Sequence, residues 1–411
     1  MLKFIKFSFI FLLSILSLNA QISDCSCVND LNFLNEKIQK TPSYKVSKVD
    51  YEKAYSKIKE AVKNLGSGYD CFLQLNILML SLNDRHCNLY GINKGATEQI
   101  KKNDKKFNEF KNSKLFAAYP KPTIDIDSLT TALKKQSNNS IEGIYYRKNN
   151  MSIGVYKSLE TDFYNVIVLN SENELWKTGE LIYTLVPYGN NYLLAVGGSL
   201  SSKRMIAFGE RIENGVFLTL GFQKDESVVN YSVSIHPEST YLKREISPET
   251  IYLKAGSFSS WNPKLSEADQ FYKSLEGKLI HKNLILDLRD NGGGGNRNSD
   301  GLYKVLKKFL KNNNVYVLVN NRTASNAEQF AYKLSEFQNC TILGNRTNGT
   351  LAYEIVDSNY NLPCNNLLAV LTSKKHGKYL KFESKGIEPD VKLSSTLDWI
   401  IQVKNYIQEN N

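Results

Sequence analysis

The stretch that decides the fold is residues 284–295, which read LILDLRDNGGGG. Its first half is an apolar run that predicts a buried strand. Polar residues and four consecutive glycines follow directly, and glycines allow a tight turn whose N–H groups point outward. In sheets covered by helices on both faces, reactive groups gather at the carboxyl ends of such strands. The glycine turn is therefore the first candidate for a site.

Strands and helices alternate on both sides of this stretch. We expect strands at residues 251–253, 284–288, 315–319 and 340–343, and helices at residues 266–275, 301–310, 325–336 and 396–406. This alternation predicts that residues 248–411 form an α/β domain, with a mixed sheet and helices on both faces.

Two further regions precede this domain, as expected for 411 residues. Residues 21–115 carry apolar side chains at helical spacing, for example Ala54, Ile58 and Val62, and predict a helical region. Residues 116–247 predict a β-rich insertion, either a barrel or a sandwich. Its candidate strands lie at residues 143–146, 152–156, 163–169, 180–186, 192–196, 216–222 and 227–235.

Residues 1–20 have the pattern of a secretory signal peptide: two lysines, a short apolar run and a final Ala20. A membrane anchor is the alternative, but the run is short. No later apolar run is long enough for a membrane span. Seven Asn-x-Ser/Thr sequons occur, three of them in or beside motifs where a glycan would obstruct the backbone. We therefore expect export to the periplasm or exterior of a bacterium.

The formal net charge of +11 comes from scattered lysines rather than from a basic stripe. This argues against nucleic acid as a partner. Export allows the six cysteines to form disulfides. We expect bridges within the amino-terminal region and one between Cys340 and Cys364. Cys25 and Cys27 have a metal-like spacing, but no second pair follows, so no metal is expected.

The glycine turn has three interpretations. Gly292 and Gly293 offer backbone N–H groups of the kind that an oxyanion hole requires. A flexible turn is the plainer alternative, and a phosphate cradle is disfavoured because no Lys-Ser/Thr follows the glycines.

Ser325 also has two interpretations. It lies in residues 315–330, VYVLVNNRTASNAEQF, where a predicted strand turns into a helix. Serine is a favoured helix N-cap. The N–H groups at the helix start would also stabilise a developing anion, so a nucleophile uses the same geometry, although position alone favours the cap.

Five ordered motifs in residues 248–392 resemble the tail-specific, or C-terminal processing, serine peptidase family, which includes the tricorn-core peptidases. They are Gly256-Ser257-Phe258 after a Tyr-Leu strand, D-L-R-x-N-x-G-G at 287–294, T-A-S-x-A-E at 323–328, G-x-R-T at 344–347 and E-x-x-G-I-x-P-D at 383–390. The resemblance implies that Ser325 is the nucleophile. It implies N–H groups of Asn326 and of Gly292 or Gly293 as oxyanion donors, and no cofactor.

One departure from the family pattern bears on the mechanism. Better-known members have a lysine base about 25 residues after the serine, and here that position is Thr350. The other branch takes a histidine from an L-x-D-x-H segment and a late glutamate. Leu82, Asp84 and His86 match that segment, and Glu383 matches the glutamate. The resemblance therefore implies His86 as general base and Glu383 as its support, through a hydrogen bond or a bridging hydroxyl.

Several alternatives remain. The other histidines, His236, His281 and His376, are possible bases, and Glu383 is a possible salt-bridge partner of Arg289 or Arg346. Our first hypothesis is a serine endopeptidase that cleaves peptides or exported and envelope proteins, with oligomerisation possible. The second is an inactive peptidase fold that serves as a peptide-binding or scaffold module. A third gives the β-rich region an apolar ligand. The distance between His86 and Ser325 discriminates between the first two.

Overall fold

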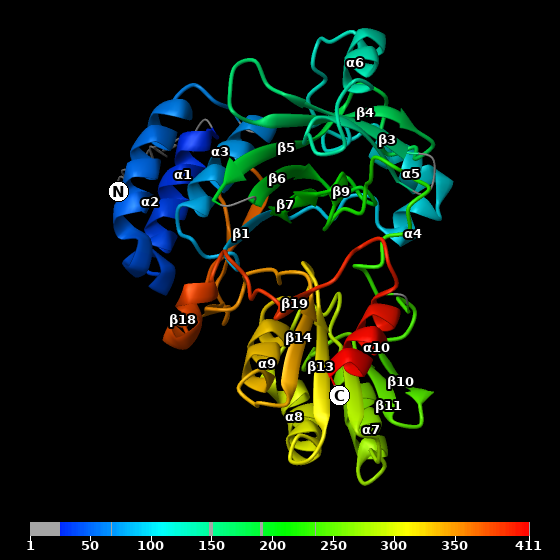
Figure 1. The fold of residues 1–411 in the computed structure, drawn as a ribbon. Coiled ribbons are helices and arrows are strands. Elements are labelled where there is room, and N and C mark those ends of the chain that lie inside the picture. The colour runs from blue at the N-terminus through cyan, green and yellow to red at the C-terminus, as the bar shows by residue number, and fades with distance from the viewer. Residues whose placement is uncertain (1–24, 67, 148–150, 190–191, 235, 411) are drawn as a thin grey trace, which may run out of the picture.

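The computed structural model describes residues 25–66, 68–147, 151–189, 192–234 and 236–410. The predicted signal peptide lies outside the described residues. The described chain forms two lobes, one containing the amino-terminal helices and a curved sheet, the other containing the second large sheet (Figure 1). None of its described helices is both long enough and apolar enough to cross a membrane.

The second lobe contains a six-stranded mixed sheet, as the sequence predicts. Its order is β10 (Tyr241–Ser247), β11 (Thr250–Ala255), β12 (Asn283–Asp287), β13 (Asn314–Val319), β14 (Cys340–Gly344) and β19 (Val391–Lys392). β10 is antiparallel to β11, and all other neighbours are parallel. The carboxyl ends of β12 and β13, which precede the glycine turn and Ser325, therefore lie side by side.

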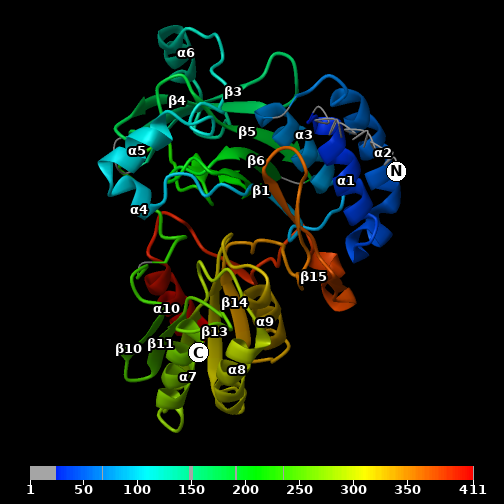
Figure 2. The same cartoon turned by 180° about the vertical axis from the view of Figure 1, so that it is seen from behind.

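Helices cover both faces of this sheet (Figure 1, Figure 2). One face packs against α7 (Lys264–Leu275), α8 (Asn296–Phe309) and α9 (Asn326–Leu334). The other packs against α10 (Trp399–Asn410), whose Trp399 is fully buried against Tyr252 and Leu343. The apolar strands that suggested a doubly covered sheet are indeed buried on both sides.

The first lobe joins the helical and β-rich regions around one hydrophobic core. Its helices are α1 (Cys27–Ile38), α2 (Pro42–Ala61) and α3 (Tyr69–Leu80), with short α4 (Glu98–Lys101), α5 (Asp104–Lys111) and α6 (Ile126–Leu133). α3 packs on the sheet, where the Tyr69 hydroxyl donates to the Val196 carbonyl at 2.9 Å. A division of the chain at residues 115 and 247 remains a proposal.

The β-rich region is a meander that closes towards a barrel. Its strands follow in chain order: β2 (Gly143–Arg147), β3 (Met151–Lys157), β4 (Tyr164–Ser171), β5 (Leu181–Tyr188), β6 (Tyr192–Gly198) and β7 (Met205–Glu210). A ribbon of β8 (Ile212–Glu213) and β9 (Val216–Phe217) comes next. Bridges from Gln223 to Val216 and to Tyr146 then lead back to β2.

Two strand expectations in this region are corrected by the structure. The strand expected at residues 227–235 is not formed, since the described residues 227–234 contain turns, and the one expected at residues 216–222 is formed only at Val216–Phe217, with turns after it. The sequence analysis also missed β7. Polar side chains explain these turns: Asp225 accepts from the Ser227 N–H at 2.9 Å, and Asn230 accepts from the Ser232 N–H at 3.0 Å. Such local bonds compete with strand pairing.

A long excursion links the two lobes. After α9 and β14 the chain forms β15 (Tyr353–Glu354), the hairpin β16 (Asn359–Asn361) and β17 (Leu367–Val370), β18 (Lys374–Lys375) and the 3₁₀ helix η1 (Gly377–Phe382). β17 pairs antiparallel with β1 (Asn88–Gly91) of the first lobe. Figure 2 shows this excursion reaching the amino-terminal helices.

The described residues contain two disulfides, one of which anchors the same junction. Cys27 is bridged to Cys71, which confirms a bridge within the amino-terminal region. Cys25 is bridged to Cys364 in the hairpin, while Cys340 is free and buried. The expected Cys340–Cys364 bridge is wrong because Cys340 begins β14 in the second lobe, whereas the hairpin has crossed to the first.

Candidate active site

Ser325 lies at the turn between β13 and α9, at the N-cap position of the helix. Its backbone has φ +56° and ψ −125°, which is unusual for a residue with a side chain. Its N–H donates to the buried carboxylate of Glu328 at 2.9 Å. Backbone strain of this kind persists only where surrounding contacts hold it, and it is concentrated at functional sites.

His86 lies beside this serine, although 239 residues separate them in sequence. Its Nε2 is 3.0 Å from the Ser325 Oγ. The histidine occupies the turn between α3 and β1, where its own N–H donates to Asp84 Oδ1 at 3.0 Å. The other Asp84 oxygen accepts from the Thr372 hydroxyl, just after β17. The excursion therefore holds the segment that carries His86.

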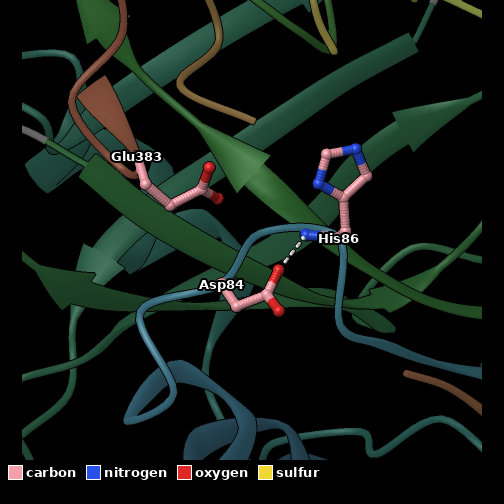
Figure 3. A group of neighbouring side chains, drawn as sticks. All are labelled: Asp84, His86 and Glu383. Carbon is pink, nitrogen blue, oxygen red and sulfur yellow. Dashed lines mark hydrogen bonds between the residues drawn. The ribbon is translucent and has the colours of Figure 1, made fainter. Parts of the chain in front are cut away.

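Glu383 is buried at the end of η1 and belongs to the same cluster. Its Oε1 accepts from the Arg85 N–H at 3.0 Å, and its Oε2 accepts from the Leu351 and Ala352 N–H groups at 2.9 and 2.7 Å. One ring nitrogen of His86 and one oxygen each of Asp84 and Glu383 lie within 4.8 Å of one another (Figure 3). His86 Nδ1 is buried and has no hydrogen-bond partner among the described residues.

These surroundings shift the protonation of both groups. Burial, and secondarily the positive charge of Arg85, lowers the pKa of His86 to about 4. Burial and the nearby Asp84 carboxylate raise the pKa of Glu383 to about 8, although three N–H donors oppose the shift. His86 is therefore neutral at pH 7, which is the form that a general base requires.

The same three side chains have the donor types of a cation site. Every oxygen of Asp84 and Glu383, however, already accepts from an N–H or O–H group. Asp84 holds the backbone of His86 through the His86 N–H, whereas neither carboxylate is hydrogen-bonded to the imidazole ring. We assign no metal to them.

The glycine turn lies directly against the serine. Gly293 has φ +91°, and a Cβ there would come within 2.7 Å of the Ala324 carbonyl and 2.9 Å of the Asn326 nitrogen, so only glycine fits. Its N–H donates to Asn291 Oδ1 at 2.9 Å. The N–H groups of Gly292 and Asn326 have no hydrogen-bond acceptor among the described residues. These two are the open donors beside Ser325.

The other candidate bases, and the arginines considered as salt-bridge partners of Glu383, make their contacts elsewhere. His376 contacts Glu354 at 3.0 Å, His236 contacts Glu238 at 3.4 Å and His281 contacts Glu245 at 3.8 Å. Arg289 pairs with Asp287 at 2.7 Å and Arg346 with Glu388 at 3.3 Å, so neither pairs with Glu383.

Sequence reasoning missed two residues that support the site. The sequence analysis quoted Glu328 only as part of the T-A-S-x-A-E motif and gave it no role. Its carboxylate accepts hydrogen bonds from the N–H groups of Ser325, Gly349 and Thr350 and from the Thr347 hydroxyl. Thr350, at the position of the family's lysine, is thus held by Glu328 through its N–H. Arg85 carried no motif signal at all, because it fills a variable position between Asp84 and His86.

Residues 295–393 match the model of peptidase family S41, a segment that contains Ser325 and Glu383. The protein is accordingly a serine peptidase. No curated protein matches the chain.

Solved structures with a similar chain course include mature CPAF, with 12% identity, 93% of this chain and 95% of that chain covered, and a TM-score of 0.44. The photosystem II D1 C-terminal processing protease has 15% identity, coverages of 89% and 93%, and a TM-score of 0.33. A lipoprotein from Streptococcus agalactiae has 18% identity, coverages of 42% and 71%, and a TM-score of 0.31.

Proposed function

We propose that this S41 peptidase is an endopeptidase in which Ser325 is the nucleophile, His86 the general base and Glu383 the support of that base. The observation that carries the proposal is the 3.0 Å contact between His86 Nε2 and Ser325 Oγ. That contact favours a working peptidase over a scaffold that has lost its base.

The chemistry follows from the atoms at the site. His86 Nε2 takes the hydroxyl proton while Ser325 Oγ attacks the scissile carbonyl carbon, and the imidazolium then gives this proton to the leaving amine. Water, activated by the same imidazole, hydrolyses the acyl enzyme. The developing oxyanion is held by the N–H groups of Asn326 and Gly292, because the Gly293 N–H already donates to Asn291 Oδ1.

Glu383 acts through the opposite side of the ring. Ionised Glu383 near Nδ1 favours the tautomer with a proton on Nδ1 and a lone pair on Nε2, as the mechanism needs. A bridging hydroxyl would transmit this preference where no direct hydrogen bond is made. This arrangement corresponds to the Ser-His-Glu branch near the tricorn-core peptidases, which we propose for this chain.

The substrates and location are also proposals. We infer export to the bacterial periplasm or exterior, with peptides and exported or envelope proteins as substrates. The signal-like residues 1–20 and the two disulfides support this location. Nucleic acid has no support as a partner from the scattered charge.

The test compares Ser325→Ala with Ser335→Ala, a serine at the other end of α9 whose hydroxyl donates to the Tyr332 carbonyl. We expect Ser325→Ala to lose cleavage of an unfolded protein and labelling by a fluorophosphonate, with little change in Tm. Ser335→Ala should retain both. Undiminished cleavage by Ser325→Ala would place the nucleophile elsewhere.

A further inference from the structure

Arg85 immediately precedes the base in the chain, and its side chain joins three parts of the molecule. We propose that Arg85 is a positioning residue: held between the barrel and the loop after β14, its guanidinium fixes the segment that carries His86 against Ser325. The inference rests on the proposed function, because it concerns how the same base is held.

The barrel provides a slot for this guanidinium. Gly209 in β7 has no side chain, and a Cβ there would lie 1.5 Å from Arg85 Nη2. On another side the guanidinium lies 4.8 Å from the ring centroid of Tyr192, at the start of β6. A flat cation over an aromatic ring is a favourable contact. The slot therefore suits a planar group and excludes a larger residue at position 209.

The second lobe provides the other end of the bridge. Arg85 Nη1 donates to the carbonyl of Asn348. The Asn348 N–H in turn donates to the Thr323 carbonyl at 3.0 Å, two residues before Ser325. Its side chain donates to the Asn321 carbonyl at 2.9 Å. One side chain thus connects the barrel to the turn that bears the nucleophile.

The backbone of Arg85 completes the arrangement. Its N–H is the donor to Glu383 Oε1, and the next residue is His86. A displacement of Arg85 would therefore move the Glu383 contact and the histidine ring together. Geometry alone makes Arg85 a link between the nucleophile turn, the base and the support of the base.

Charge adds a second, separable effect. The Arg85 cation lowers the pKa of His86, next in importance to burial. His376 acts in the same direction and Glu354 of β15 in the opposite one, while Asp84 and Glu383 lie in the same cluster. Removal of the arginine charge should consequently make His86 easier to protonate.

Two substitutions separate geometry from charge. Arg85→Lys keeps the charge but loses the planar fork that fits the slot. Arg85→Met keeps much of the length and loses both. The matched control is Arg204→Met: Arg204 also lies over a tyrosine, 5.4 Å from the Tyr90 ring, and donates to the Gly91 carbonyl at 2.7 Å, but it does not touch the His86 turn.

The experiment uses the full chain labelled with ¹³C in its four histidines, and follows the His86 ring signal against pH. A His86→Gln sample assigns the signal. We expect Arg85→Met to raise the His86 pKa by about 0.5 to 1 unit. The kcat for a peptide substrate should fall about tenfold or more while KM changes less than about twofold.

Arg85→Lys should leave the His86 titration near that of the parent protein but still lower kcat, and Arg204→Met should change neither. An unchanged kcat per folded molecule in both Arg85 variants would reduce Arg85 to a structural contact and overturn the proposal. So would an equal loss of kcat in Arg204→Met. Since the titration is read without substrate, it remains informative even if Ser325→Ala were to disprove the proposed nucleophile.

Discussion

Glu328 is the group whose removal should most damage the nucleophile turn. Its carboxylate is fully buried, and four donors converge on it. Oε2 accepts from the Ser325 and Thr350 N–H groups, each at 2.9 Å. Oε1 accepts from the Gly349 N–H at 2.7 Å and from the Thr347 hydroxyl at 2.5 Å.

Glu328→Gln keeps the shape but replaces one acceptor oxygen with an NH₂ group. Whichever oxygen is lost, two donors then face another donor. Each buried donor without an acceptor costs about 1 to 3 kcal/mol, so the free energy of unfolding should fall by about 2 to 6 kcal/mol. That is a large share of the stability of an ordinary domain.

Activity should fall as well, because the Ser325 N–H is one of the lost bonds and the backbone at φ +56° depends on such contacts. We expect the rate of fluorophosphonate labelling, measured on the folded protein, to fall at least about tenfold. Denaturant unfolding gives the stability change in the same samples.

The matched control is Glu336→Gln, in the segment after α9, where an exposed carboxylate pairs with Lys378 at 2.8 Å. Its substitution should change stability by less than about 0.5 kcal/mol. A Glu328→Gln protein as stable and as rapidly labelled as Glu336→Gln would refute the reasoning, since it would mean that the buried donors find other acceptors.

Three further predictions concern the base and the excursion. Because the pKa of His86 is lowered to about 4, the loss of kcat/KM that comes from protonation of His86 should be centred near pH 4; a histidine step near pH 6.5 in the Glu383→Gln variant, with the fold intact by circular dichroism, would contradict this. Because the pKa of Glu383 is raised to about 8 and its carboxylate selects the productive tautomer, kcat/KM should rise through about pH 8. Glu383→Gln should abolish that rise and lower kcat/KM by at least about 100-fold; a persisting rise would assign it to another group. Replacing Cys25 and Cys364 with serine should lower the free energy of unfolding by about 2 to 5 kcal/mol and reduce kcat, whereas Cys340→Ala should keep the response of the parent protein to reductant. If reductant lowered the stability of the double variant as much as that of the parent protein, this role for the bridge would be contradicted.

The second lobe was predictable because its signals are local. Apolar strands and intervening helices occur where residues 248–411 suggested, since each apolar run is long enough to be buried and each turn has polar or glycine residues. β10 was missed because its residues 241–247, YLKREIS, are largely polar. An edge strand that faces solvent on one side lacks the apolar run that marks a central strand.

The site itself was only partly predictable, because only some of its parts are brought together by local signals. Ser325 and the glycine turn follow neighbouring parallel strands, so topology brings them together once the sheet is known. The positions of His86 and Glu383 depend on the pairing between β1 and β17. The paired residues are 276 positions apart at Gly91–Leu367 and 282 at Asn88–Val370, so neither strand gives a local sign of the other. Only the family motifs pointed to them.

The excursion explains why the base is found in the first lobe. Thr372, just after β17, holds Asp84, and the start of the excursion at Leu351 and Ala352 holds Glu383. The same chain then returns through η1 to deliver Glu383 itself. Anything that loosens the hairpin must disturb the base and its support at once, while Ser325 stays anchored by Glu328 in the second lobe. Activity should thus be lost at a lower denaturant concentration than the one that unfolds the six-stranded sheet.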